Sequence, residues 1–192
     1  MSTLTTSKYN LSIIELVLVT VVSVALGIAL WAWTFVYDIL SPFLKVVGLK
    51  YAVAGLWILP SILLSYIVRK PGVAVLASIM AALVQGTLTH WGLMSLVWGL
   101  VQGLGAELVF LLFFYRCWRV WVLSLAAMAS SLCSYLLDFY LYGYHSLSTL
   151  FNIVQVSVFM TSALIFAAGL GYFLAQRLLK AGLLHQFEIS RE

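Results

Sequence analysis

One stretch of the chain limits its possible folds more than any other, WGLVQGLGAELVFLLFF at residues 98–114. It is almost wholly apolar, and it is long enough to cross a lipid bilayer as a helix, which takes about 20 residues. It also contains a carboxylate, Glu107. A charged side chain inside a membrane helix costs about 2.5–3.5 kcal/mol. Because helix formation does not require that cost, we expect Glu107 to have a functional role and a polar partner.

Apolar stretches of this kind make up most of the sequence. Of the 192 residues, 64% are hydrophobic and 8% are charged, whereas soluble domains carry about 25% charged residues. So few charges cannot cover a surface in water, and the sequence therefore predicts an all-α integral membrane protein. Its length leaves room for about six spans in a single domain, residues 1–192. The first apolar run is long enough to remain as a span, so we expect no cleaved signal peptide.

Polar turns divide the apolar sequence into six predicted transmembrane helices that form a compact bundle. Their approximate bounds are 11–35, 51–68, 73–88, 93–115, 120–141 and 147–174. Residues 36–50 are the longest connection, and we interpret them as a loop or a short helix that lies on the membrane surface or folds over a cavity. Pro60 lies within the second span, where it removes a helix hydrogen bond and predicts a kink.

The basic residues predict the orientation of the bundle. One side collects eight of them, whereas Lys45 and Lys50 lie on the other. The eight are Lys8, Arg69, Lys70, Arg116, Arg119, Arg177, Lys180 and Arg191. Cytoplasmic loops carry the excess of Lys and Arg, so both termini are expected in the cytoplasm. Because these charges lie at span ends, the net charge of +4 does not indicate a nucleic-acid partner.

Polar residues within the spans gather toward the predicted outer side, which predicts a polar pocket that opens outward. They are Gln85, Gln102, Asp138, Asn152 and Gln155, with Glu107 somewhat deeper. Tyr135, Asp138 and Tyr142 follow one face of the fifth span. Gln102 and Glu107 are five residues apart, about 140° around a helix, so we do not expect both to point into one small pocket.

Each of these residues also has a structural interpretation. Asn and Gln in membrane helices often only bond a neighbouring helix, and an Asp near the interface can be solvated. For Glu107 the alternative is a protonated carboxyl group that bonds a neighbouring helix.

Signals for catalysis and metal binding are missing from the sequence. It has no His/Glu metal-ligand cluster, no G-x-S-x-G motif and no phosphate-binding loop. The spacing of Cys117 and Cys133 fits neither a metal motif nor a disulfide framework. We therefore expect no enzyme activity, no metal and no cofactor.

Three segments carry a resemblance to a known family: RKPGVAVLAS at 69–78, LVQGTLTHWG at 83–92 and QGLGAELVF at 102–110. With the six-span pattern they resemble the S components of energy-coupling factor (ECF) transporters, and more narrowly the YkoE branch, which is associated with thiamine or its hydroxymethylpyrimidine precursor. The resemblance implies a protein of the bacterial cell membrane that captures a vitamin outside and passes it inward. It implies a transmembrane T component and two cytoplasmic ATPases as partners, with an AxxxA face on the first helix, which Ala25 and Ala29 match.

The residue types suit a thiamine-like ligand. An aminopyrimidine places a ring nitrogen beside an amine, and a carboxylate or amide can pair with both. A thiazolium ring is a flat cation that suits aromatic faces and an acid. The expected ligand contacts are Glu107, Gln102, Gln85, Asn152, Gln155, Trp91, Tyr135, Asp138 and Tyr142. The alternatives are an S component for another vitamin, a small intramembrane enzyme, or a structural or assembly subunit of a membrane complex.

Overall fold

The computed structural model of the chain describes residues 10–46, 48–184 and 187–191, and every regular element in this part is helical. The α-helices are α1 (Ile13–Val46), α2 (Leu59–Val68), α3 (Val73–Leu88), α4 (Ser95–Leu112), α5 (Val120–Leu141), α6 (Thr149–Ala163) and α7 (Leu170–Lys180). A 3₁₀ helix, η1 (Lys50–Ile58), precedes α2, and a π-helical stretch, η4 (Leu164–Gly169), joins α6 to α7. Short 3₁₀ turns are η2 (Gly92–Met94), η3 (Tyr144–Ser146) and η5 (Glu188–Arg191). The all-α prediction is confirmed.

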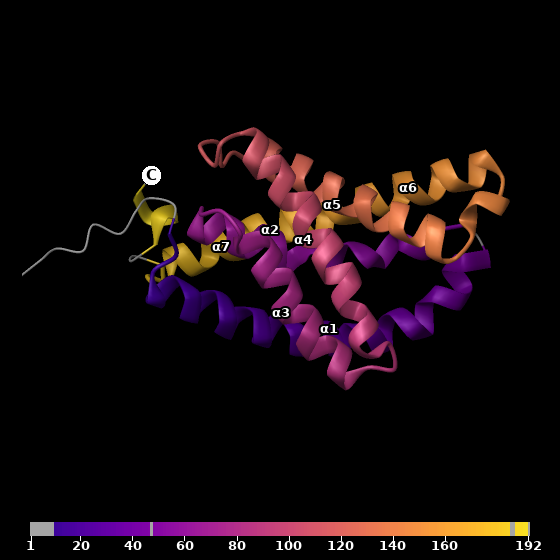
Figure 1. Ribbon diagram of the computed structural model, residues 1–192, viewed down its shortest axis with the longest axis horizontal. Coiled ribbons are helices and arrows are strands. Elements are labelled where there is room, and N and C mark those ends of the chain that lie inside the picture. Colours follow the sequence, from indigo (N-terminus) through magenta and orange to yellow (C-terminus); the bar gives the residue numbers. More distant parts are fainter. Residues whose placement is uncertain (1–9, 47, 185–186, 192) are drawn as a thin grey trace, which may run out of the picture.

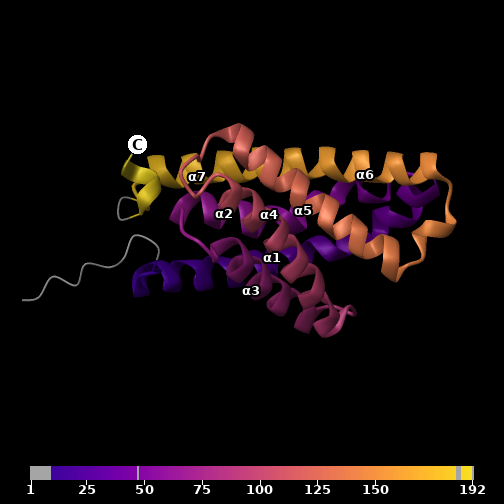
Figure 2. The ribbon, with the colours of Figure 1, turned by 45° about the horizontal axis from the view of Figure 1, so that its top comes forward.

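Five segments in the described part of the chain are long and apolar enough to cross a membrane: Ile13–Val46, Lys50–Val68, Gly92–Leu112, Val120–Leu141 and Thr149–Lys180. The sixth apolar segment, α3, is shorter, with 16 residues. The two longest segments, α1 and α6–α7, follow the long axis of the molecule (Figures 1 and 2), whereas α3 and α4 cross that axis obliquely. The protein is thus a multi-pass membrane protein.

Residues 36–46 differ from the prediction, because they continue α1 and form no loop. The helix runs for 34 residues and contains Pro42. Proline lacks an N–H and interrupts a helix hydrogen bond, but here only the last turn follows it. Ile39, Phe43 and Val46 continue the exposed apolar face of the helix up to its end. This extension brings the last turns of α1 close to η1.

The second predicted span is also built differently from the prediction. It consists of η1 followed by α2, and Pro60 is the second residue of α2. A proline in the first turn of a helix interrupts no hydrogen bond, because the first N–H groups have no partner within the helix. The predicted kink is therefore replaced by a change from 3₁₀ to α geometry. All residues of α2 are buried, so α2 is the central helix of the bundle.

The remaining helix bounds are close to those predicted. α3 and α5 have the expected bounds, 73–88 and 120–141. The fourth helix is shorter than 93–115, because Phe114 and Tyr115 have positive φ angles of 51° and 54° and form a turn. The last span starts at Thr149 and extends beyond 174 to Lys180.

Glycines bring α4 into backbone contact with both neighbouring helices. A Cβ atom at Gly103 would lie 2.6 Å from Val75 Cα on α3, and one at Gly105 would lie 2.7 Å from Ser130 Cα on α5. Small residues at such contacts let membrane helices approach closely. Gln102 directly precedes Gly103, and its carbonyl accepts a hydrogen bond from Ser130 Oγ at 2.7 Å, so its backbone position is tightly defined.

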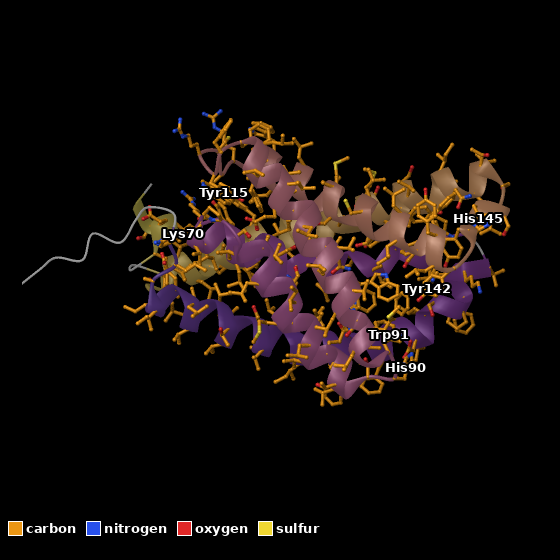
Figure 3. The ribbon with its side chains drawn as sticks, viewed as in Figure 1. Lys70, His90, Trp91, Tyr115, Tyr142 and His145 are labelled. Atoms are coloured by element: carbon orange, nitrogen blue, oxygen red, sulfur yellow. The ribbon has the colours of Figure 1, made fainter. Side chains whose placement is uncertain are left out.

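The start of α1 is anchored to the turn between α2 and α3. Ser12 and Glu15 form a capping box, in which Ser12 N donates to Glu15 Oε2 at 2.7 Å and Glu15 N donates to Ser12 Oγ at 3.3 Å. Lys70 Nζ lies 2.7 Å from the same Glu15 oxygen in a buried ion pair. Lys70 lies at the end of the molecule opposite Trp91 and Tyr142 (Figure 3).

Candidate ligand-binding cavity

A cavity of about 580 Å³ opens between α1, η1, α3, α4 and α5. Small-molecule sites typically have volumes of about 300–1,000 Å³, so this one can hold a vitamin-sized ligand. Of the nine residues expected to contact a ligand, five line it: Gln85, Trp91, Gln102, Asp138 and Tyr142. Trp91 and Tyr142 lie at the end of the bundle away from Lys70 and Tyr115 (Figure 3).

Asp138 is the buried carboxylate of this cavity, with 6% of its surface exposed. The Tyr51 hydroxyl donates a hydrogen bond to its Oδ2 at 2.5 Å, and Trp98 Nε1 donates to its Oδ1 at 2.7 Å. A carboxylate offers about four lone-pair positions, so two remain for a ligand. The two bonds fix the orientation of the carboxylate before a ligand arrives.

Two amide side chains line the cavity together with Asp138. Gln85 Nε2 donates to Thr34 Oγ1 at 3.1 Å, which holds the Gln85 amide in place. The residue Gln102 is only 7% exposed, and among the described residues its side chain has no hydrogen-bond partner. An amide presents one acceptor beside one donor, so Gln102 can pair with a matching donor–acceptor edge.

Three further polar atoms on the cavity lining have no hydrogen-bond partner within the described part of the chain. They are the hydroxyls of Ser78 and Ser134 and the indole nitrogen of Trp57. Buried polar groups in proteins are nearly always hydrogen-bonded, so such atoms mark places where a bound molecule gains contacts. The lining thus offers hydroxyl, amide, indole and carboxylate groups.

Aromatic rings line the walls of the cavity. The ring centres of Tyr37 and Trp57 are 4.9 Å apart, and those of Trp57 and Trp91 are 5.4 Å apart. On another wall Tyr51 stacks on Phe159 at 4.8 Å. Such walls favour a planar ligand that can stack between them.

Charged groups of both signs complete the lining. In addition to Asp138, they are Asp38, Lys45 and Lys50. His90 Nδ1 lies 3.8 Å from Asp38 Oδ2, at the exposed edge of the cavity. Tyr142 follows the last turn of α5, and its pKa is raised by burial and by the nearby Asp138 and Tyr144. Its hydroxyl therefore stays neutral at physiological pH and remains a hydrogen-bond donor.

Glu107, which the sequence predicts to contact a ligand, does not line this cavity. Its carboxylate accepts hydrogen bonds from Gly72 N at 2.5 Å and Ala74 N at 3.1 Å, and from the Tyr115 hydroxyl at 2.6 Å. The polar partner of Glu107 is therefore the amino-terminal turn of α3. The N–H groups there have no partner within the helix, and they favour a negative charge. Burial and the bond to Glu107 raise the pKa of Tyr115, so the hydroxyl remains a donor.

Tyr135, Asn152 and Gln155 also lie outside the cavity lining. The Tyr135 hydroxyl donates to Asn152 Oδ1 at 2.6 Å, and Asn152 Nδ2 donates to the carbonyl of Tyr144 at 3.0 Å. These two residues support the η3 turn, while the Tyr135 ring packs against Tyr51, with the ring centres 5.6 Å apart. Gln155 is 2% exposed and lies on the face of α6 that is buried in the bundle. None of these three residues lines the cavity, and their contact with a ligand stays a prediction.

Sequence reasoning did not assign Lys50, Tyr51 and Trp98 to the ligand site. Trp98 lies four residues before Gln102, on the same face of α4, so helical spacing could have identified it. Lys50 and Tyr51 fell at the boundary between a presumed loop and a span, where no periodic pattern was available. The extension of α1 and the 3₁₀ geometry of η1 place them beside Asp138.

Ala25 and Ala29 lie on the exposed face of α1. The opposite face carries Ser23 and Gly27, which are buried, and a Cβ atom at Gly27 would lie 2.7 Å from Val84 Cβ on α3. The small residues of α1 thus divide into a set that packs inside the bundle and a set that faces outward.

Comparisons with known proteins identify the family. A family model described as "ABC-type cobalt transport system, permease component" matches residues 14–133. The putative HMP/thiamine permease protein YkoE of Bacillus subtilis (strain 168) is 31% identical over 179 residues, which cover 93% of this chain and 89% of that protein. A solved structure described as "Crystal structure of an S-component of ECF transporter" aligns with a TM-score of 0.90 and 30% identity, over 95% of this chain and 92% of that one. The chain is a member of this family, the S components of ECF transporters.

Three short segments predicted that the chain belongs to this family. The matches confirm that prediction over 93% and 95% of the chain. These relatives are components of transporters, so the S component is not an enzyme. The family description names cobalt, but within the described residues no group of three or more His, Cys, Asp or Glu side chains is placed to hold a metal ion.

Proposed function

We propose that this S component captures thiamine or its hydroxymethylpyrimidine precursor outside the cell for ATP-driven uptake. The observation that carries the proposal is the position of Asp138, a buried carboxylate oriented by Tyr51 and Trp98 inside an aromatic cavity. The relative YkoE is described as a "putative HMP/thiamine permease protein", which points to the same class of ligand.

The chemistry of an aminopyrimidine corresponds to the lining. Its exocyclic amine can donate to Asp138 or to the Gln102 carbonyl oxygen, while a ring nitrogen accepts from the Gln102 amide. Charge-assisted pairs of this type are among the stronger hydrogen bonds in proteins. The rings of Tyr37, Trp57 and Trp91 can stack on a flat heterocycle.

The partners follow from the family. We propose that a transmembrane T component and two cytoplasmic ATPases drive transport in the bacterial plasma membrane, and that the exposed face with Ala25 and Ala29 contacts the T component. Alanines on an exposed face let another helix approach the α1 backbone closely. The cavity opens at the end away from the basic residues Lys70, Arg116 and Arg119, which is the outer end by the excess of basic residues in cytoplasmic loops.

The test is a binding titration of the purified, detergent-solubilised protein, with tryptophan fluorescence as the signal, because Trp57, Trp91 and Trp98 line the cavity. Thiamine and hydroxymethylpyrimidine are titrated separately, with Co²⁺ as the control for the family description. At least one of the two organic ligands should quench the tryptophan fluorescence saturably. Asp138→Asn should bind that ligand at least about tenfold more weakly, equal to about 1.4 kcal/mol.

Glu107→Gln serves as the matched control, because it makes the same chemical change to a carboxylate outside the cavity. Its binding should stay within about twofold of the wild type. A folded protein, free of carried-over ligand, that responds to neither organic ligand would refute the proposed substrate. Saturable binding of Co²⁺ alone would favour the metal in the family description.

A further inference from the structure

Lys50 places a positive charge inside the candidate cavity, against three aromatic rings. Its Nζ atom lies 5.2 Å from the ring centre of Tyr51, 5.5 Å from that of Tyr142 and 5.6 Å from that of Tyr144. It also donates a hydrogen bond to the Tyr144 hydroxyl at 2.9 Å. A cation within about 6 Å of a ring centre is attracted to the ring, and aromatic cages of this kind bind cationic ligands. Here the chain itself supplies the cation.

This cage adjoins the buried carboxylate through a shared residue. The ring of Tyr51 faces Lys50 Nζ, and the hydroxyl of the same side chain donates to Asp138 Oδ2. Lys50 and Asp138 therefore form a pair of opposite charges separated by one tyrosine ring. The negative charge that could attract a cationic ligand is already balanced from within the protein.

A cationic ligand would meet a like charge at the same rings. The other charged groups on the lining do not remove this effect, because Lys45 offsets the charge of Asp38, and Asp38 lies at the exposed edge of the cavity, where solvent screens it. A neutral heterocycle meets no such repulsion, and it can still stack on the rings and pair with Gln102 and Asp138. The cost to a cation is greater in a cavity than in water, because low-dielectric surroundings screen charges less.

We infer that Lys50 is a tethered cation that sets the charge selectivity of the cavity, so that a neutral pyrimidine is preferred over a ligand with a permanently charged ring. Lys50 thereby favours hydroxymethylpyrimidine over thiamine. This inference rests on the proposed function, because it distinguishes between the two ligands of the same site.

The sharpest test compares two ligands of nearly identical shape and different charge. One is thiamine, and the other is its analogue in which a neutral thiophene ring replaces the thiazolium ring. Their dissociation constants are measured at about pH 8, where aminopyrimidines are neutral, for the wild type, Lys50→Met and Lys180→Met. Methionine keeps the unbranched chain and removes the charge, and Lys180→Met makes the same change at an exposed lysine at the end of α7, outside the cavity.

The wild type should bind the neutral analogue at least about fivefold more tightly than thiamine, equal to about 1 kcal/mol. Lys50→Met should reduce that ratio to within about twofold of one, whereas Lys180→Met should leave it unchanged within about twofold. Lys50→Arg, which keeps the charge, should preserve it. If Lys50→Met does not fold, Tyr144→Phe removes the acceptor that holds Nζ and should move the ratio in the same direction.

The role of Lys50 and the proposed function would be contradicted by different results. If the ligands bind and wild-type protein prefers thiamine to its neutral analogue, or if Lys50→Met leaves the ratio unchanged, the selectivity role of Lys50 is overturned while the proposed function stands. If folded wild-type protein binds neither of these ligands nor hydroxymethylpyrimidine, the proposed function itself fails, and the role of Lys50 fails with it.

Discussion

Tyr51 and Asp138 are 87 residues apart in the sequence and are joined by a hydrogen bond of 2.5 Å between the tyrosine hydroxyl and Oδ2. The bond connects the start of η1 to the end of α5. It orients the carboxylate of the candidate site, and it places the Tyr51 ring between that carboxylate and Lys50.

Removing this hydroxyl should weaken ligand binding. In Tyr51→Phe the ring contacts remain, but Asp138 keeps only the bond from Trp98. Hydrogen bonds to charged groups are worth about 1.5–3 kcal/mol, so we expect at least about tenfold weaker binding by fluorescence titration. Tyr135→Phe is the control, because its hydroxyl bonds Asn152 outside the cavity. Equal losses in the two variants would contradict the role of Tyr51.

Gln102 should contribute to ligand affinity and not to stability. Gln102→Leu keeps the volume and removes an amide whose side chain bonds none of the described residues, so the unfolding temperature should stay the same or rise. Ligand affinity should fall at least about tenfold, equal to about 1.4 kcal/mol. Gln155→Leu makes the same change at a buried position outside the cavity and should leave affinity within about twofold. Wild-type affinity in Gln102→Leu would remove Gln102 from the site.

Glu107 should contribute to stability and not to ligand affinity. Glu107→Gln removes the negative charge at the start of α3 and leaves one acceptor oxygen for the N–H groups of Gly72 and Ala74. Helix caps are worth about 0.5–2 kcal/mol, so we expect a loss of free energy of unfolding in that range with unchanged ligand affinity. Thermal unfolding in detergent measures the first quantity and titration the second. A large loss of affinity at full stability would return Glu107 to the ligand site.

Gly103 should tolerate no side chain. In Gly103→Ala the new methyl group would lie 2.6 Å from Val75 Cα, so α3 and α4 must separate, at a cost of about 1–3 kcal/mol. In Gly171→Ala on α7, the nearest atom is a leucine methyl at 3.3 Å, which can rotate away. That control should be neutral or stabilising, because alanine is a better helix former than glycine by about 1 kcal/mol. Similar unfolding temperatures for the two variants would refute this contact.

The sequence predicted those parts of the site that lie on regular helices. Gln85, Gln102 and Asp138 were identified because a polar residue in an apolar span stands out against its neighbours, and all three line the cavity. The six apolar segments could be predicted for the same reason, since turns interrupt the apolar runs sharply.

The remaining features depend on contacts between distant segments. The partners of Glu107 are backbone N–H groups of another helix, which no pattern of side chains reveals. Lys50 and Tyr51 reach Asp138 only because α1 continues through Pro42 and η1 follows it. Asn152 and Tyr135 were assigned to the ligand, whereas they bond each other, and sequence spacing cannot tell a polar group that faces a cavity from one that faces a neighbouring side chain.

The length of α1 has a consequence for the surrounding lipid. At 1.5 Å per residue, a helix of 34 residues is about 51 Å long, whereas the hydrocarbon core of a bilayer is about 30 Å thick. Exposed apolar side chains are present at both ends of this helix, at Ile13 and at Phe43 and Val46. Such a mismatch is relieved when the helix tilts or when the lipids thicken locally around it. Either response has a cost that depends on bilayer thickness, so the energy of this protein should change with the thickness of its membrane.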